Sequence, residues 1–172
     1  MVISADVIRK MGNKAAARAL MQANQVPVVP GSDGPVPDAE TAAALAEKIG
    51  YPVLVKASAG GGGRGMRRVY SPDALADAFS AAQAEAQACF GDGELYLEKL
   101  VEHPRHVEFQ ILADRQGHVI HLGERDCSIQ RKNQKMIEES PCWGLDDATR
   151  EAMGRASVLA AKAAGYEGAG TV

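Results

Sequence analysis

The segment that decides the fold is KASAGGGGRGMRRV, which runs from Lys56 to Val69. An apolar run precedes it over 51–55 and an extended pattern returns over 66–70, so we expect two strands joined by a glycine-rich turn. The four consecutive glycines leave backbone N–H groups unobstructed, and such groups bind phosphate oxygens when cations flank them. The segment is either a loop that closes over the phosphates of a nucleotide or a mobile surface hairpin.

The composition of the 172-residue chain is that of a globular protein, with 46% hydrophobic and 24% charged residues. A net charge of −3 gives no electrostatic reason to expect nucleic acid or an anionic membrane as a partner. No apolar run approaches the length of a membrane span, roughly 18 residues, and no secretory signal pattern opens the chain. The cysteines are odd in number and form no C-x-x-C pair, so we expect reduced thiols and a cytoplasmic protein.

Hydrophobic periodicity and cap residues predict a mixed α+β chain. Helices are expected over 4–24 with a break at Gly12-Asn13, over 39–49, from 71–73 to about 89, and over 146–164. Strands are expected over 95–101, 107–112 and 118–123, and residues 167–172 resemble the opening of another strand. The proline-rich stretch from Val26 to Asp38 is a candidate boundary between structural units.

Two groups of residues suit a nucleotide. The ammonium groups of Lys14 and Lys56, together with the glycine loop, match a polyphosphate, although Lys14 at a helix start also fits a solvated side chain. The strand end from Glu98 to Val101, followed by His106, can offer backbone N–H and C=O groups to the edge of a base. The alternative is a half-buried strand with a solvated Glu-Lys face.

A third group is the run ERDCSIQRKNQKMIEE, from Glu124 to Glu139, which mixes acids, cations and amides. It is too polar for a core and too long for a simple turn, and it is interpreted either as a charged site or as a solvated loop. Within it, Cys127 is expected to be a small buried side chain rather than a nucleophile.

Four collinear segments make the chain recognisable: KASAGGGGRGM, EKLVEHPRHVEFQILAD, ERDCSIQRKNQK and GYEGAGTV. From Ile3 to Val172 the chain resembles the biotin carboxylase component of biotin-dependent carboxylases such as acetyl-CoA carboxylase, members of the ATP-grasp superfamily. The resemblance implies an α+β ATP-grasp fold in partial form. It assigns 1–28 to connecting helices after a nucleotide-fold domain, 29–100 to the α/β lid domain, and 101–172 to the first part of a large antiparallel-sheet C-terminal domain.

The resemblance also assigns site residues. Lys14 and Lys56 would contact ATP phosphates, His106 would lie beside the nucleotide, and Lys135 would help to hold bicarbonate. The other residues assigned to nucleotide binding are Gly60, Gly61, Gly62, Gly63, Gly65, Met66, Glu98, Lys99, Leu100, Val101, Gln130 and Asn133. Two positions depart from the family: Asn133 stands where a histidine is usual, and Ala59 replaces the first glycine of the lid.

The activity implied by the resemblance is that of a ligase in fatty acid metabolism. ATP and bicarbonate would form carboxyphosphate, whose carboxyl group passes to biotin on a carrier protein, with a carboxyltransferase component as a further partner and a homodimeric parent enzyme. The magnesium ligands and the catalytic arginine are expected beyond Val172, so this chain alone is not expected to complete catalysis. Two alternatives stay open: another ATP-grasp ligase, such as a carbamoyl-phosphate synthetase half, or a nucleotide-binding module without turnover.

Overall fold

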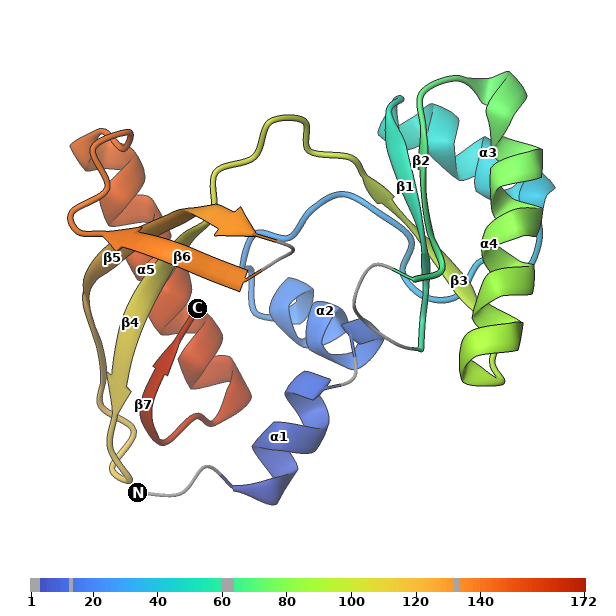
Figure 1. The fold of residues 1–172 in the computed structure, drawn as a ribbon. Coiled ribbons are helices and arrows are strands. Elements are labelled where there is room, and N and C mark those ends of the chain that lie inside the picture. The colour runs from blue at the N-terminus through green and yellow to red at the C-terminus, as the bar shows by residue number, and fades with distance from the viewer. Residues whose placement is uncertain (1–3, 13, 60–63, 132–133) are drawn as a thin grey trace. The chain divides into compact units, whose positions relative to one another are not determined.

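The protein divides into two compact units, one formed by residues 29–102 and the other by residues 1–28 together with 103–172 (Figure 1). The structure is a computed structural model that describes residues 4–12, 14–59, 64–131 and 134–172. Both units combine helices with an antiparallel sheet, which confirms the mixed α+β fold expected from the sequence.

In the unit of residues 29–102, a three-stranded antiparallel sheet has the order β2-β1-β3. The strands are β1 (Val53–Ala57), β2 (Met66–Val69) and β3 (Leu95–Lys99). Pairing of Lys56 with Met66 and of Val53 with Val69 makes β1 and β2 a hairpin around the glycine-rich segment. The two predicted strands and their pairing are therefore confirmed, while residues 60–63 of the predicted turn lie outside the described part of the chain.

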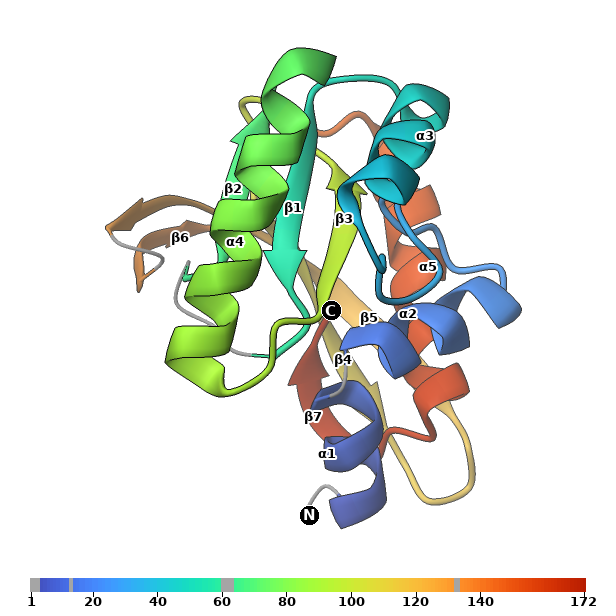
Figure 2. The ribbon, with the colours of Figure 1, turned by 90° about the vertical axis from the view of Figure 1, so that its right-hand side faces the viewer.

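Two helices cover one face of this sheet, and Figure 2 shows α4 lying across β1 and β2. Helix α3 (Ala39–Ile49) begins where Asp38 accepts a hydrogen bond from the Thr41 N–H, and Gly50 with φ 81° ends it. Helix α4 (Leu75–Phe90) ends at Gly91, which is left-handed. The shared core comprises chiefly Val53, Val55, Val69, Leu75, Phe79, Ala82, Ala86, Leu95 and Leu97.

Several boundaries in this unit differ from the expectation. The strand before the glycines covers Val53–Ala57 rather than 51–55. Residues Pro72–Ala74 form a 3₁₀ turn (η1), and the α-helix begins only at Leu75 rather than at 71–73. Strand β3 ends at Lys99 instead of 101. The Leu100 N–H still donates to the carbonyl of Pro52 (3.1 Å), which stands opposite it in the register, but Pro52 has no N–H to donate in return, so the ladder stops there.

The other unit has a four-stranded antiparallel sheet of order β6-β5-β4-β7. Its strands are β4 (Val107–Ala113), β5 (Val119–Arg131), β6 (Gln134–Glu139) and β7 (Gly168–Thr171). The predicted C-terminal strand is confirmed, because β7 pairs with β4 from Gln110↔Thr171 to Ala113↔Gly168.

Helix α5 (Asp147–Ala164) packs on β4 and β5 through small buried residues, which are Gly154, Ser157, Ala160, Ala161 and Ala164. Two shorter helices, α1 (Ala5–Gly12) and α2 (Lys14–Ala23), contact it, and they meet at the predicted break. No helix in the described part of the chain has the length and apolarity that a membrane span requires. The cytoplasmic location expected from the sequence stays a prediction.

The interpretation of 124–139 as a loop is wrong, because this segment forms the second half of β5 and all of β6 (Figure 1), although every residue of β6 is exposed to solvent. The third strand of the meander, expected over 118–123, continues without interruption to Arg131. Polar residues can occupy these strands because neighbouring strands supply opposite charges, as where Glu108 of β4 stands directly opposite Arg125 of β5.

Candidate functional site

Lys56, near the end of β1, has its ammonium group fixed by a carboxylate on β3. Its Nζ lies 2.6 Å from Oε2 of Glu98, and both side chains are mostly buried, with 25% and 19% exposed. The same Nζ lies 5.9 Å from the centre of the Tyr96 ring. A lysine and a glutamate that were both expected to serve a nucleotide are therefore in direct contact.

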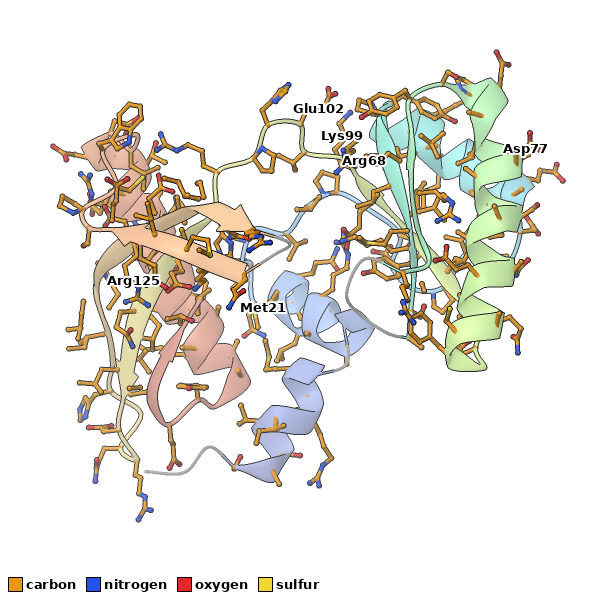
Figure 3. The ribbon with its side chains drawn as sticks, in the orientation of Figure 1. Met21, Arg68, Asp77, Lys99, Glu102 and Arg125 are labelled. Carbon is orange, nitrogen blue, oxygen red and sulfur yellow. The ribbon has the colours of Figure 1, made fainter. Side chains whose placement is uncertain are left out.

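Lys99, the last residue of β3, is held from both sides of the strand. Lys99 donates its N–H to the carbonyl of Pro30 (2.7 Å). Its ammonium group donates to the carbonyls of Gly50 and Tyr51, each at 2.8 Å. Figure 3 labels Lys99 at the end of this strand. The alternative of a solvated Glu-Lys face does not describe this segment, because both charges have protein partners.

The described end of the glycine-rich segment is built tightly. Gly65 has φ 63°, its carbonyl accepts from the Ala57 N–H (2.8 Å), and a Cβ there would lie 2.8 Å from Cβ of Ala57. The nearby Met66 is 37% exposed, and Val101 beyond β3 is 52% exposed. Several predicted residues lie outside the described part of the chain: Gly60, Gly61, Gly62, Gly63, Asn133 and the side chain of Lys14.

In the other unit, a charge cluster connects β4, β5 and β6. Glu108 of β4 accepts hydrogen bonds from Nη2 (2.5 Å) and Nε (2.9 Å) of Arg125 through Oε1, and from the ammonium group of Lys135 through Oε2. Arg125, labelled in Figure 3, also donates to Oε1 of Gln110 (3.0 Å) and lies 3.3 Å from Oε2 of Glu138. Lys135, the residue expected at bicarbonate, thus projects from a cluster that fixes it.

Protonation in this cluster follows from burial and contact. Burial alone would raise the pKa of Glu108, but hydrogen bonds from Lys135 and Arg125 outweigh it and lower that pKa. The bond to Glu108 in turn raises the pKa of Lys135 and that of Arg125. Glu108, Arg125 and Lys135 are therefore all charged at neutral pH.

His106 and Gln130 meet at an open pocket of about 480 Å³, lined by Pro104, Arg105, His106, Val107, Ser128 and Gln130. The side-chain amide of Gln130 donates to the carbonyl of Cys127 (2.8 Å) and lies 2.7 Å from Nδ1 of His106. With Nδ1 as the acceptor, the neutral ring carries its proton on Nε2. The structure therefore brings these two predicted nucleotide-binding residues together.

The sequence did not single out the acidic residue behind this pocket, Asp126. It accepts hydrogen bonds from Arg105 and Ser128. The bonds from Ser128, side chain first and then backbone, together with that from Arg105, lower the pKa of Asp126 to about 2. The local run Arg-Asp-Cys-Ser suggests a charge pair, but the true partner, Arg105, stands 21 positions away.

Cys127 is fully buried, as predicted, and burial raises the pKa of its thiol. Its sulfur lies within 4.8 Å of ligand atoms of Glu108 and Glu138, a spacing that a metal ion would tolerate. Both carboxylate oxygens of Glu108 already accept hydrogen bonds from Arg125 and Lys135. These two side chains supply the positive charge that a metal ion would otherwise bring.

A glycine-rich β-hairpin bearing a lysine, within an α/β unit, and an antiparallel sheet carrying a lysine-carboxylate cluster define the ATP-grasp class. Residues 13–172 match the family described as the Carbamoyl-phosphate synthase L chain, ATP binding domain. The chain belongs to that family.

Within the family the chain is similar to biotin carboxylases. It is 58% identical over 167 residues to the biotin carboxylase of Nostoc sp., which is 97% of this chain and 37% of that protein. A biotin carboxylase from Campylobacter jejuni in its beta-gamma-ATP complex superposes with a TM-score of 0.88 at 52% identity, covering 98% of this chain and 38% of the other.

A second solved structure, the biotin carboxylase domain dimer of Hydrogenobacter thermophilus 2-oxoglutarate carboxylase, contains MgADP, ADP and bicarbonate. It gives a TM-score of 0.85 at 51% identity and covers 98% of this chain and 37% of its own. The resemblance inferred from the four sequence segments is confirmed. The chain spans a little over a third of the length of these relatives.

Proposed function

We propose that this chain forms part of the ATP and bicarbonate site of a biotin carboxylase. The protein containing it would carboxylate biotin on a carrier protein, at the expense of ATP and through carboxyphosphate. The observation that carries the proposal is the placement of Lys135 on the buried carboxylate of Glu108, in a chain 51% identical to a domain solved with MgADP and bicarbonate. A fixed ammonium group is suited to hold an anion of this size.

The unit of residues 29–102 is proposed to be the lid domain, expected over 29–100. Lys56 would supply positive charge to the phosphates, and the glycine segment with Gly65 and Met66 would close over them. The segment from Glu98 to Val101 would present its backbone to adenine, supported by the bonds of Lys99 described above. Exclusion of water would protect carboxyphosphate from hydrolysis.

The remaining residues are proposed to be connecting helices, 1–28, and the first part of the C-terminal domain, expected over 101–172. His106, Gln130 and Asn133 would contact the nucleotide, and Lys135 would hold bicarbonate, with Lys14 as a further contact to phosphate. Magnesium would neutralise the phosphates and biotin would arrive on its carrier. A carboxyltransferase component and a second copy of the protein complete the proposed set of partners.

The test is ATP cleavage by the full-length gene product in the presence of bicarbonate and magnesium, with and without free biotin. We expect cleavage that depends on bicarbonate and that free biotin stimulates. Cleavage with no response to biotin would overturn the proposal and leave a different ATP-grasp ligase.

A second candidate follows from the family description, which names carbamoyl-phosphate synthase. Such an enzyme would also use ATP and bicarbonate, so the lysine sites described here fit both reactions. Ammonia-dependent formation of carbamoyl phosphate, without stimulation by biotin, would identify it in the same assay.

A further inference from the structure

Asp126 of β5 has a buried carboxylate, which binds residues on both sides of the pocket beside His106. Its side chain is only 5% exposed. Oδ2 accepts from Nη2 of Arg105 (2.5 Å), and Oδ1 accepts from the N–H (2.9 Å) and the hydroxyl (2.6 Å) of Ser128. Arg105 and Ser128 line the pocket from two different segments of the chain. The carboxylate of Asp126 therefore binds one residue on each side of the pocket.

The link continues from Ser128 to the backbone of His106. The Ser128 hydroxyl, which donates to Asp126, also accepts from the His106 N–H at 2.9 Å. The His106 carbonyl accepts from the Cys127 N–H at 2.7 Å. Both backbone polar groups of His106 are thereby bound to the strand segment that Asp126 anchors, so the backbone of His106 follows the position of Ser128.

Arg105 is confined from the opposite side by the loop that precedes α5. Its guanidinium carbon lies 4.5 Å from the centre of the Trp143 ring. A Cβ on Gly144 would lie 1.7 Å from Nη1 of Arg105, so a side chain at that position would displace the guanidinium group from where it now lies. Cys142 adds a weak hydrogen bond to Oδ2 of Asp126 (3.5 Å). The ion pair of Arg105 and Asp126 is therefore closely packed as well as bonded.

We propose that Asp126 is a positioning residue for the nucleotide: it holds Arg105 and Ser128 at the spacing at which His106 and Gln130 can contact the ligand. The inference rests on the proposed function, because that function assigns His106 and Gln130 to the nucleotide. Asp126 touches no ligand itself and acts only through the residues that it binds.

The first test compares Asp126→Asn with the wild type in the full-length gene product, by calorimetric titration with ADP and magnesium. The amide leaves Arg105 without its countercharge, so we expect the affinity to fall about tenfold. Glu124→Gln is the matched control. Glu124 is a buried carboxylate on the same strand that accepts from Cys142 N–H (3.1 Å) and from Arg150 (2.8 Å) but bonds to no residue lining the pocket.

The control separates positioning from general stability. We expect Glu124→Gln to lower the melting temperature while nucleotide affinity stays within about twofold of the wild type. If Asp126→Asn proves too unstable to purify, Ser128→Ala removes the same link at an exposed hydroxyl, and we expect it to weaken binding about threefold. In the background of His106→Ala, Asp126→Asn should cost less affinity than in the wild type, because Asp126 acts on the nucleotide partly by positioning His106.

Amide hydrogen exchange of residues 105–107, followed by mass spectrometry, tests the tether without any nucleotide. Faster exchange in Asp126→Asn but not in Glu124→Gln supports the tether, and equal exchange in all three proteins overturns it. If the wild type binds nucleotide and Asp126→Asn binds it equally well, the positioning role is wrong while the proposed function stands. Absence of nucleotide binding by the wild type overturns the proposed function and the positioning role together.

Discussion

Lys56 and Glu98 form an ion pair across two adjacent antiparallel strands, with Nζ and Oε2 2.6 Å apart. Leu54 stands directly opposite Glu98, so Lys56 is a diagonal neighbour of Glu98 on the same face of the sheet. The sheet therefore sets the position of the ammonium group before any ligand arrives. A cation positioned in advance costs less ordering entropy when it binds phosphate.

Lys56→Gln tests this arrangement. On the proposed role of Lys56 at the phosphates, we expect the affinity for ATP to fall at least tenfold, because a fixed positive charge is removed. The free energy of unfolding should fall by roughly 1–2 kcal/mol, because the mostly buried Glu98 loses its partner. Calorimetric titration and urea unfolding measure the two quantities. Arg68→Gln is the control, because Arg68 is an exposed cation on the neighbouring strand β2 (Figure 3). Equal loss of affinity in both variants would contradict a specific role for Lys56.

Glu108→Gln should destabilise the unit that contains β4, β5 and β6. The change leaves Arg125 and Lys135 without their shared buried countercharge, and we expect unfolding free energy to fall by about 2–4 kcal/mol. Urea unfolding gives this value. On the proposed role of Lys135 at bicarbonate, the KM for bicarbonate should also rise, because Lys135 loses the carboxylate that holds it. Glu138→Gln is the comparison, since Glu138 is a second acid beside Arg125 but is 44% exposed. Its replacement should cost less than about 1 kcal/mol; equal costs would show that burial of Glu108 does not matter.

Much of the fold could be predicted from the sequence because its signals are local. The glycine run between β1 and β2, the cap residues Asp38 and Asp146, and the stops at Gly50 and Gly165 each act within a few residues. The strands over 124–139 could not be predicted in the same way. Their charges are stabilised by partners on another strand, as with Glu108 opposite Arg125, and single-segment patterns do not reveal such pairs.

The candidate site shows the same division. The resemblance named Lys56, Glu98 and Lys135, but the structure adds which carboxylate holds each lysine. In the sequence, Glu108 is only one polar position of an alternating strand, two residues after His106. Nothing in the spacing of Arg105 and Asp126 indicated an ion pair, because the two residues meet only after β4 and β5 have paired.

The stability of the protein should depend on pH through Asp126. Its pKa is lowered from 3.8 to about 2 in the folded state, so the folded state binds the proton more weakly than the unfolded state. The stabilisation is therefore fully present above pH 3.8 and is lost as pH falls towards 2. The shift corresponds to roughly 2 kcal/mol. Urea unfolding at pH 5 and at pH 2.5 should show the wild type losing more stability than Asp126→Asn. Identical pH dependence in the two proteins would contradict the lowered pKa.

Gly65→Ala should destabilise the hairpin for two independent reasons. The residue has φ 63°, which disfavours any side chain, and the new Cβ would lie 2.8 Å from Cβ of Ala57 on the facing strand. We expect the free energy of unfolding to fall by about 1–3 kcal/mol, measured with urea. Gly34→Ala is the control in the same unit, because no atom lies within 4 Å of a Cβ there. It should leave stability unchanged or raise it by up to about 1 kcal/mol, because alanine reduces the freedom of the unfolded chain. If both variants were equally stable, the close approach of Gly65 to Ala57 would not constrain the hairpin, and the hairpin would tolerate a side chain at this position.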